Sequence, residues 1–124
     1  MKPISARDAP KPVAAYSPGI EAAGVVYTAG QVGIDPASGA LADGLEAQAR
    51  VAFSNVGAIV RAAGLGARNI AKITIFMTDL GQFAVVNRVF EQFVGEHRPA
   101  RTTIGVAALP LGALIEVEAI AVRT

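Results

Sequence analysis

The spacing of the apolar residues changes along this chain, and the order of those changes constrains the fold more than any other feature. Residues 24–29 and 30–34 are rich in β-branched side chains, which is typical of strands, and residues 35–39 place Pro and Gly as a tight turn requires. Over residues 45–63 the apolar positions recur every three or four residues, which predicts an amphipathic helix with Gly64 as its C-cap. The first half therefore predicts a hairpin followed by a helix.

The second half of the chain repeats the alternation between strand and helix. Residues 70–77 predict a strand, and Asp79 is an N-cap candidate for a second helix with one apolar stripe. Strands are predicted again at residues 101–106 and 114–122, with a turn at residues 109–112 between them. This order predicts an α+β protein with two helices and about six strands. The stripe of the second helix consists of Phe83, Val86, Phe90 and Phe93.

Two helices of this length can cover only one face of such a sheet. The last predicted strand is apolar on one face, and its other face still carries Leu114, Ile120 and Val122. Hydrophobic residues make up 52% of the chain and charged residues only 17%, against the usual ~25%, although a small domain has much surface to cover with polar groups. No linker divides residues 1–124, so we expect one domain that buries part of its sheet against further copies of itself.

The charge balance and the missing residue types exclude several functions. Eleven Lys and Arg against ten Asp and Glu leave a net charge of +1, too little to drive sequence-independent binding to nucleic acid or an anionic membrane. There is no Cys for a thiolate metal site, and one His cannot build a His-rich metal centre. No apolar run approaches the ~18 residues of a membrane span, and we see no signal peptide. We expect a cytoplasmic protein without a metal, bound to neither nucleic acid nor membrane.

Four polar side chains stand where they could act on a small molecule. Arg101 begins a strand, and a guanidinium there suits bidentate recognition of a carboxylate or a phosphate. Glu116 and Glu118 share one face of an apolar strand, where a carboxylate is costly unless it is paired or holds a water. Tyr16 lies in a Pro-flanked loop and offers a hydroxyl. Each has a structural alternative: an Arg that closes a turn, a buried ion pair for either Glu, or an ordinary half-buried Tyr.

Two further residues are weaker candidates. Asn87, inside the second predicted helix, either hydrogen-bonds the helix to a loop or is an incidental polar residue. His97 lies between Glu96 and Arg98 in a charged turn, where we expect a solvated side chain without a catalytic role. From the residues alone, this polar set suits a small carboxylate ligand and water chemistry, but it names no reaction.

The order and spacing of several motifs resemble those of the RidA family, the reactive intermediate or imine deaminases that are also called YjgF-type or L-PSP proteins. The resemblance extends from about Pro12 to Val122. The motifs are AGQ at 29–31, DPASG at 35–39, AKITIFMTD at 71–79, VNRVF at 86–90, EHRPARTT at 96–103 and AALPLGALIEVEAIA at 107–121.

The resemblance implies a chorismate-mutase-like fold, in which two helices pack on one face of a mixed six-stranded sheet and homotrimers form around a central barrel, with the sites between subunits. It implies hydrolysis of enamines and imines, such as 2-aminoacrylate and 2-aminocrotonate, to 2-oxo acids and ammonia without a cofactor. The carboxylate-binding Arg of the family falls on Arg101, its water-positioning Glu on Glu116 and its aromatic hydroxyl on Tyr16. Its other substrate contacts fall on Gly30, Asn87 and Thr103.

Departures from the family pattern bear on the substrate. Thr103 stands where the family often has Cys, Leu111 stands where Lys is common, and Ala14 and Ala15 precede Tyr16 in place of the usual Gly-Pro. Two alternatives therefore stay open: a non-catalytic protein that binds a 2-oxo acid in the same cleft, and a deaminase of a larger enamine such as an aminomuconate-type intermediate. A ribonuclease or translation inhibitor, a third function attached to this family, is disfavoured by the near-neutral charge.

Overall fold

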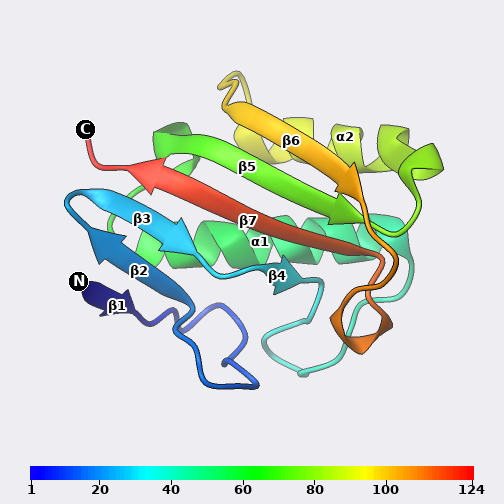
Figure 1. Cartoon of the computed structure of the whole chain (residues 1–124), viewed down its shortest axis with the longest axis horizontal. Helices are drawn as coiled ribbons and strands as arrows, with labels where there is room; N and C mark the ends of the chain where they lie inside the picture. Colours follow the sequence, from blue (N-terminus) through cyan, green and yellow to red (C-terminus); the bar gives the residue numbers. More distant parts are fainter.

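The computed structural model describes residues 1–124 as one seven-stranded sheet with two helices (Figure 1). The helices are α1 (Leu45–Ala62) and α2 (Phe83–Val94), and the three short 3-10 helices are η1 (Ala67–Asn69), η2 (Leu80–Gln82) and η3 (Pro110–Gly112). The strands are β1 (Lys2–Ile4), β2 (Gly19–Ala22), β3 (Val25–Thr28), β4 (Gln31–Val32), β5 (Ile70–Met77), β6 (Ala100–Gly105) and β7 (Ile115–Val122).

The sheet has the order β1-β2-β3-β7-β5-β6, and β4 pairs with β7 further along the same edge as β3. Only β5 and β6 run parallel, because α2 connects them as a crossover; every other pair is antiparallel. The predicted mixed sheet is confirmed, but the predicted count of six strands is wrong. The strands that the sequence did not predict are β1 and β2, which have three and four residues, too few to display a clear period of two, whereas β4 falls inside the predicted strand at residues 30–34.

Both helices lie on one face of the sheet, behind it in Figure 1, and the apolar core fills the space between. Alternate residues of β7 point into this core, as the sequence predicts. In the same way the core face of β5 consists of Ile73, Ile75 and Met77, all fully buried. The buried residues of β7 are Ile115, Val117, Ala119 and Ala121.

The opposite face of the sheet has no second layer. Along β7 it presents Glu116, Glu118 and Ile120, which are half-buried or exposed. It also carries three large apolar side chains on neighbouring strands, which the register aligns with these positions: Phe76, Ile104 and Tyr27. This face therefore mixes charge with exposed apolar surface.

The helix ends differ slightly from their predicted caps. Gly64 adopts a left-handed φ of 80°, but the C-cap residue is Ala63, and Gly64 follows it. Asp79 caps η2, not α2: its Oδ1 accepts a hydrogen bond of 2.9 Å from the Gly81 amide, and α2 begins only at Phe83. Asp79 stands too early because a 3-10 turn precedes the α-helix. Neither helix has the length and apolar content that a membrane crossing requires.

Candidate active site

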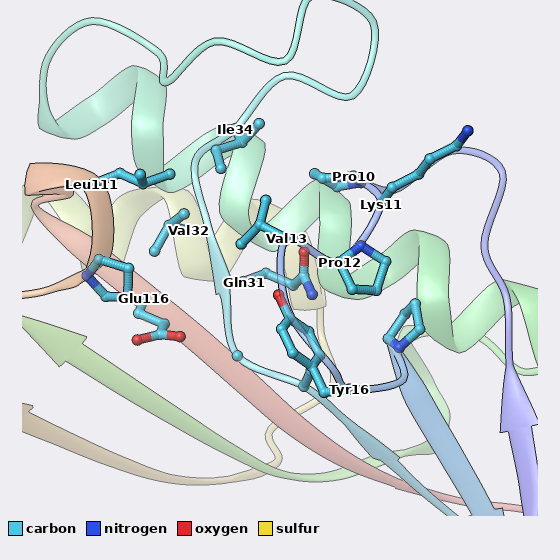
Figure 2. Close-up of a pocket in the computed structure, with 14 residues that line it drawn as sticks. Pro10, Lys11, Pro12, Val13, Tyr16, Gln31, Val32, Ile34, Leu111 and Glu116 are labelled. Atoms are coloured by element: carbon cyan, nitrogen blue, oxygen red, sulfur yellow. The ribbon is translucent and has the colours of Figure 1, made fainter.

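A cavity of about 400 Å³ lies where the N-terminal loop, β4 and η3 approach the start of β7 (Figure 2). Three of the predicted site residues, Tyr16, Gly30 and Glu116, line it. Glu116 projects into the cavity from β7, and Tyr16 does so from the loop. The other lining residues are Pro10, Lys11, Pro12, Val13, Pro18, Ala29, Gln31, Val32, Ile34, Pro110 and Leu111.

The position of the Glu116 carboxylate depends on the absence of a side chain at residue 30. Glu116 pairs with Val32 of β4, and its side chain folds over Gly30 just before that strand. A Cβ atom on residue 30 would collide with the carboxylate of Glu116. Gly30 therefore makes room for the acid, in addition to any contact that its backbone could offer a ligand.

The Glu116 carboxylate has no charged partner. The ion pairs of the structure are Arg50–Glu46 and Arg123–Glu21, so neither Glu116 nor Glu118 forms an ion pair within its own chain. Burial raises the pKa of Glu116 above its usual value, and the negative charge of Glu118 on the same strand adds to this effect. An ionised carboxyl group with a raised pKa is a stronger proton acceptor than an ordinary Glu.

A second hollow of similar volume, about 400 Å³, lies between α2 and the start of β6. Arg101 is its central cation. The Cζ atom of Arg101 lies 4.9 Å from the ring centroid of Phe83 and 4.8 Å from that of Phe90, so both rings support the guanidinium by cation–π contact. The residues that line this hollow are Asn87, Phe90, Glu91, Arg98, Pro99 and Arg101.

A chain of hydrogen bonds holds Arg101 from one side. Its Nη1 donates to Oδ1 of Asn87 over 2.8 Å, and Nδ2 of Asn87 donates to Oε1 of Glu91, also over 2.8 Å. Asn87 thus connects the helix to a strand, which settles its two interpretations in favour of the hydrogen-bonding one. The other guanidinium N–H groups have no protein partner and are free for a carboxylate.

Thr103 lies on the same face of β6 as Arg101, since the two residues pair with Ile73 and Ile75 of β5. The Thr103 hydroxyl oxygen is buried without a hydrogen-bond partner. A buried unpaired hydroxyl is rare in a folded protein.

A single chain does not bring Arg101 and Glu116 together. Arg101 is aligned with the core face of β5, whereas Glu116 lies on the face without helices. Two strand spacings and three residues along β7 also place their Cα atoms roughly 14 Å apart. Each chain therefore keeps the hollow around Arg101 and the cavity around Glu116 apart.

The environment of His97 differs from the prediction. Its Nε2 lies 2.7 Å from the carbonyl oxygen of Ile70, and the side chain is half-buried, not solvated. The hydrogen bond ties the turn after α2 to the start of β5. The expected absence of a catalytic role is not tested by this contact.

Sequence reasoning missed the aromatic support of Arg101, because Phe83 and Phe90 were assigned to the apolar stripe of the helix. Their spacing of seven residues, with Asn87 between them, places all three side chains on one helical face and could have indicated the contact. No group of three or more His, Asp or Glu side chains is arranged to hold a metal ion.

The fold and these hollows define a small α+β protein with carboxylate and guanidinium groups set to meet a small ligand. The family model described as Endoribonuclease L-PSP matches residues 6–123. The chain belongs to this family, the RidA or L-PSP proteins, which confirms the resemblance seen in its motifs.

Several known proteins are similar to the chain over nearly its whole length. A Salmonella typhimurium protein named 2-iminobutanoate/2-iminopropanoate deaminase is 46% identical over 98% of both chains. A crystal structure of E. coli TdcF with bound serine superimposes with a TM-score of 0.96, at 41% identity and complete coverage of both chains. RidA from an Antarctic Psychrobacter gives a TM-score of 0.96 at 39% identity, over 99% of this chain and 100% of that one. The predicted class of enzyme agrees with these names.

Proposed function

We propose that this protein is a deaminase that hydrolyses 2-imino acids and their enamine tautomers to 2-oxo acids and ammonia. The observation that carries the proposal is the half-buried, unpaired Glu116 carboxylate with its raised pKa, placed in a cavity beside Tyr16. The names of the curated relatives support it further.

Arg101 anchors the substrate carboxylate in this proposal. Two rings and Asn87 hold the guanidinium before the ligand arrives, so little conformational freedom is lost on binding. The bidentate contact fixes the plane of the carboxylate and therefore the direction of the adjacent C=N bond. The backbone next to Thr103 and Gly30 supplies the remaining contacts.

Glu116 orients a water against the C=N carbon and accepts its proton. As the water oxygen bonds to that carbon, the Glu116 carboxyl passes the proton taken from water to the imine nitrogen, which gives a carbinolamine. Glu116 then takes the proton of the carbinolamine hydroxyl and delivers it to nitrogen, directly or through the Tyr16 hydroxyl, so that the C–N bond breaks as the C=O bond forms and ammonia leaves. Imines hydrolyse without catalysis, so correct placement of water and substrate supplies a sufficient gain.

The active unit in this proposal is a homotrimer in which Arg101 of one chain faces Glu116 of the next. Two observations support this assembly: Arg101 and Glu116, each the centre of a partial site, lie on opposite faces of the sheet, and the face without helices carries the exposed Ile104 and Tyr27 beside the half-buried Phe76. Closed rotational symmetry would complete every partial site with its counterpart on a neighbouring copy.

The test couples purified protein to a serine or threonine dehydratase while semicarbazide traps free imine. We expect faster release of 2-oxo acid with the wild type and no acceleration with Arg101→Ala. If neither protein accelerates release while 2-oxo acids raise the melting temperature of the wild type, the protein is a binding protein and the deaminase proposal fails. Acceleration that survives Arg101→Ala would remove Arg101 from the site.

A further inference from the structure

We infer that α1 positions Glu116 through two buried amide side chains, Asn55 and Gln48, which fix the register between β4 and β7. The kinetic consequences rest on the proposed function, because both amides would then act through the proposed proton acceptor. Asn55 is 1% exposed and Gln48 is 4% exposed. Polar side chains buried so deeply are unfavourable unless their hydrogen bonds are satisfied, so the partners of these two amides show what they hold in place.

The register needs support from outside the strand pair because β4 is too short to fix it. β4 has two residues and pairs only with β7, where Val32 is aligned with Glu116. Strands usually have about five or six residues, so this pair has few ladder hydrogen bonds. A shift by one residue would bring Ala29 or Gln31 to the place of Gly30. Any Cβ atom at that place collides with the Glu116 carboxylate, so the position of the acid depends on the register.

Asn55 holds β4 from the helix side of the sheet. Its Nδ2 donates hydrogen bonds to the carbonyl oxygen of Ile34 over 2.9 Å and to that of Val32 over 3.4 Å. These two carbonyls flank Gly33, where the Ile34 amide donates to the Val32 carbonyl over 2.8 Å in a γ-turn that ends β4. One amide group therefore binds both ends of the turn and fixes where β4 stops.

Gln48 holds the start of β7 from the same helix. Its Oε1 accepts a hydrogen bond of 2.8 Å from the amide of Leu114, the residue before β7, and its Nε2 donates to the carbonyl of Ala42 over 3.0 Å. The turn after β4 also packs tightly here, since a Cβ atom on Gly33 would come within 2.6 Å of the Gln48 Cα atom. Gln48 and Asn55 are seven residues apart, about two helical turns, and lie on one face of α1. The helix therefore sets β4 and β7 relative to each other.

Loss of these hydrogen bonds would loosen the Glu116 cavity and leave the Arg101 hollow intact. Arg101 is held by side chains of α2, and neither amide forms a hydrogen bond with that helix or with β6. A looser β4 admits water to the Glu116 carboxylate, which reduces the burial that raises its pKa. The charged groups that act on this carboxylate or line its cavity are Glu118 on the same strand and Lys11, whose ammonium group points away (Figure 2). Both stay in place, so a changed pKa of Glu116 reports its position.

The test compares Asn55→Ala and Gln48→Met with a matched control, Asn69→Ala. Methionine adapts well to a buried site, so Gln48→Met should fold even if Asn55→Ala does not. Asn69 also holds a loop to β7, because its Nδ2 donates to the Val122 carbonyl at the far end of the strand and its Oδ1 accepts from the Gly66 amide. In the dehydratase-coupled assay, with rates expressed per folded protein, we expect both test variants to lower kcat by about 10-fold with KM unchanged. Asn69→Ala should leave kcat unchanged.

A carbon-detected NMR titration of the Glu116 carboxyl group measures its placement without turnover. We expect the pKa of Glu116 to fall toward the ordinary Glu value in Asn55→Ala and Gln48→Met, and to stay at the wild-type value in Asn69→Ala. If kcat and the titration of both test variants match those of Asn69→Ala, the inference is overturned while the proposed function stands. If the wild type hydrolyses no imine, the proposed function fails and the titration alone decides the inference: a lowered pKa supports it, and an unchanged pKa overturns it.

Discussion

The Arg101 guanidinium contacts several side chains of its own chain, whereas the Glu116 carboxylate has no hydrogen-bond or ion-pair partner. Two rings and an asparagine hold the guanidinium of Arg101, and the asparagine is itself held by Glu91. The carboxylate of Glu116 has no partner, and burial together with Glu118 raises its pKa. In the proposed function this difference separates two tasks: the group proposed to bind the substrate carboxylate is held in place before the ligand arrives, and the group proposed to exchange a proton is kept poorly solvated.

The first prediction removes each side of this comparison and then recombines them. We expect Arg101→Ala and Glu116→Gln each to lower kcat/KM for imine hydrolysis by about 100-fold or more, because one loses the anchor and the other the proton acceptor. Oligomers refolded from an equal mixture of the two variants should recover about a quarter of the wild-type activity if each site combines two chains. Two partial sites acting within one chain would give no recovery on mixing.

The second prediction disturbs the Glu116 cavity alone. Gly30→Ala places a methyl group against the carboxylate of Glu116, which must move, so we expect a loss of activity of about 10- to 100-fold. The atoms that would collide belong to a flexible side chain, and the fold should persist, which circular dichroism can check. Gly66→Ala is the matched control, because nothing surrounds that position, and it should leave kinetics unchanged.

The third prediction loosens the Arg101 hollow. Asn87→Ala removes the acceptor of the 2.8 Å hydrogen bond, and we expect KM to rise by about 10-fold with a smaller change in kcat. The two rings still hold the guanidinium, so the loss should be smaller than that of Arg101→Ala. Steady-state kinetics with one imine substrate separates the two parameters. A kcat that falls as far as kcat/KM would contradict a role limited to binding.

The fourth and smallest prediction concerns pH. The activity should fall on the acid side at a pH above the usual Glu pKa of ~4.3, since Glu116 must be ionised to accept a proton. Glu118→Gln removes the neighbouring charge and should move this limb to lower pH, with the activity plateau unchanged. If the pH–rate profiles of the variant and the wild type coincide, the charge of Glu118 does not raise the pKa of Glu116.

The same pKa shift affects stability with a definite sign. Because the folded pKa of Glu116 is raised, its contribution to stability is full below the ordinary Glu pKa and is lost as pH rises through the raised value. Glu116→Gln removes this loss, so the variant should melt above the wild type at neutral pH, which differential scanning calorimetry can check. The difference should shrink below the ordinary carboxyl range.

The sequence predicts the long elements better than the site. α1, β5 and β7 each display a clear period over many residues, whereas β1 and β2, which were not predicted, are too short to do so. The period of two within each strand shows that Glu116 and Glu118 share one face of β7 and that Arg101 and Thr103 share one face of β6. It does not show which of these faces packs against the helices. Only the register of β5 with its two neighbours places the pairs on opposite sides.

The contacts made by loops lie further beyond sequence patterns. Tyr16, Gly30 and Leu111 line one cavity but come from three segments that are far apart in the chain, so no local spacing in the sequence predicts that they meet. The sequence also does not predict the left-handed conformation of Leu111, because leucine rarely adopts a positive φ.

The crossover that joins β5 to β6 has a consequence for how such a protein diversifies. The Arg101 hollow is built from this one continuous stretch of chain, while the apolar wall around Leu111 and Val13 comes from the N-terminal loop and η3. Substitutions in these two loops therefore change the wall of the Glu116 cavity without touching the stretch of chain that, in the proposed function, holds the substrate carboxylate.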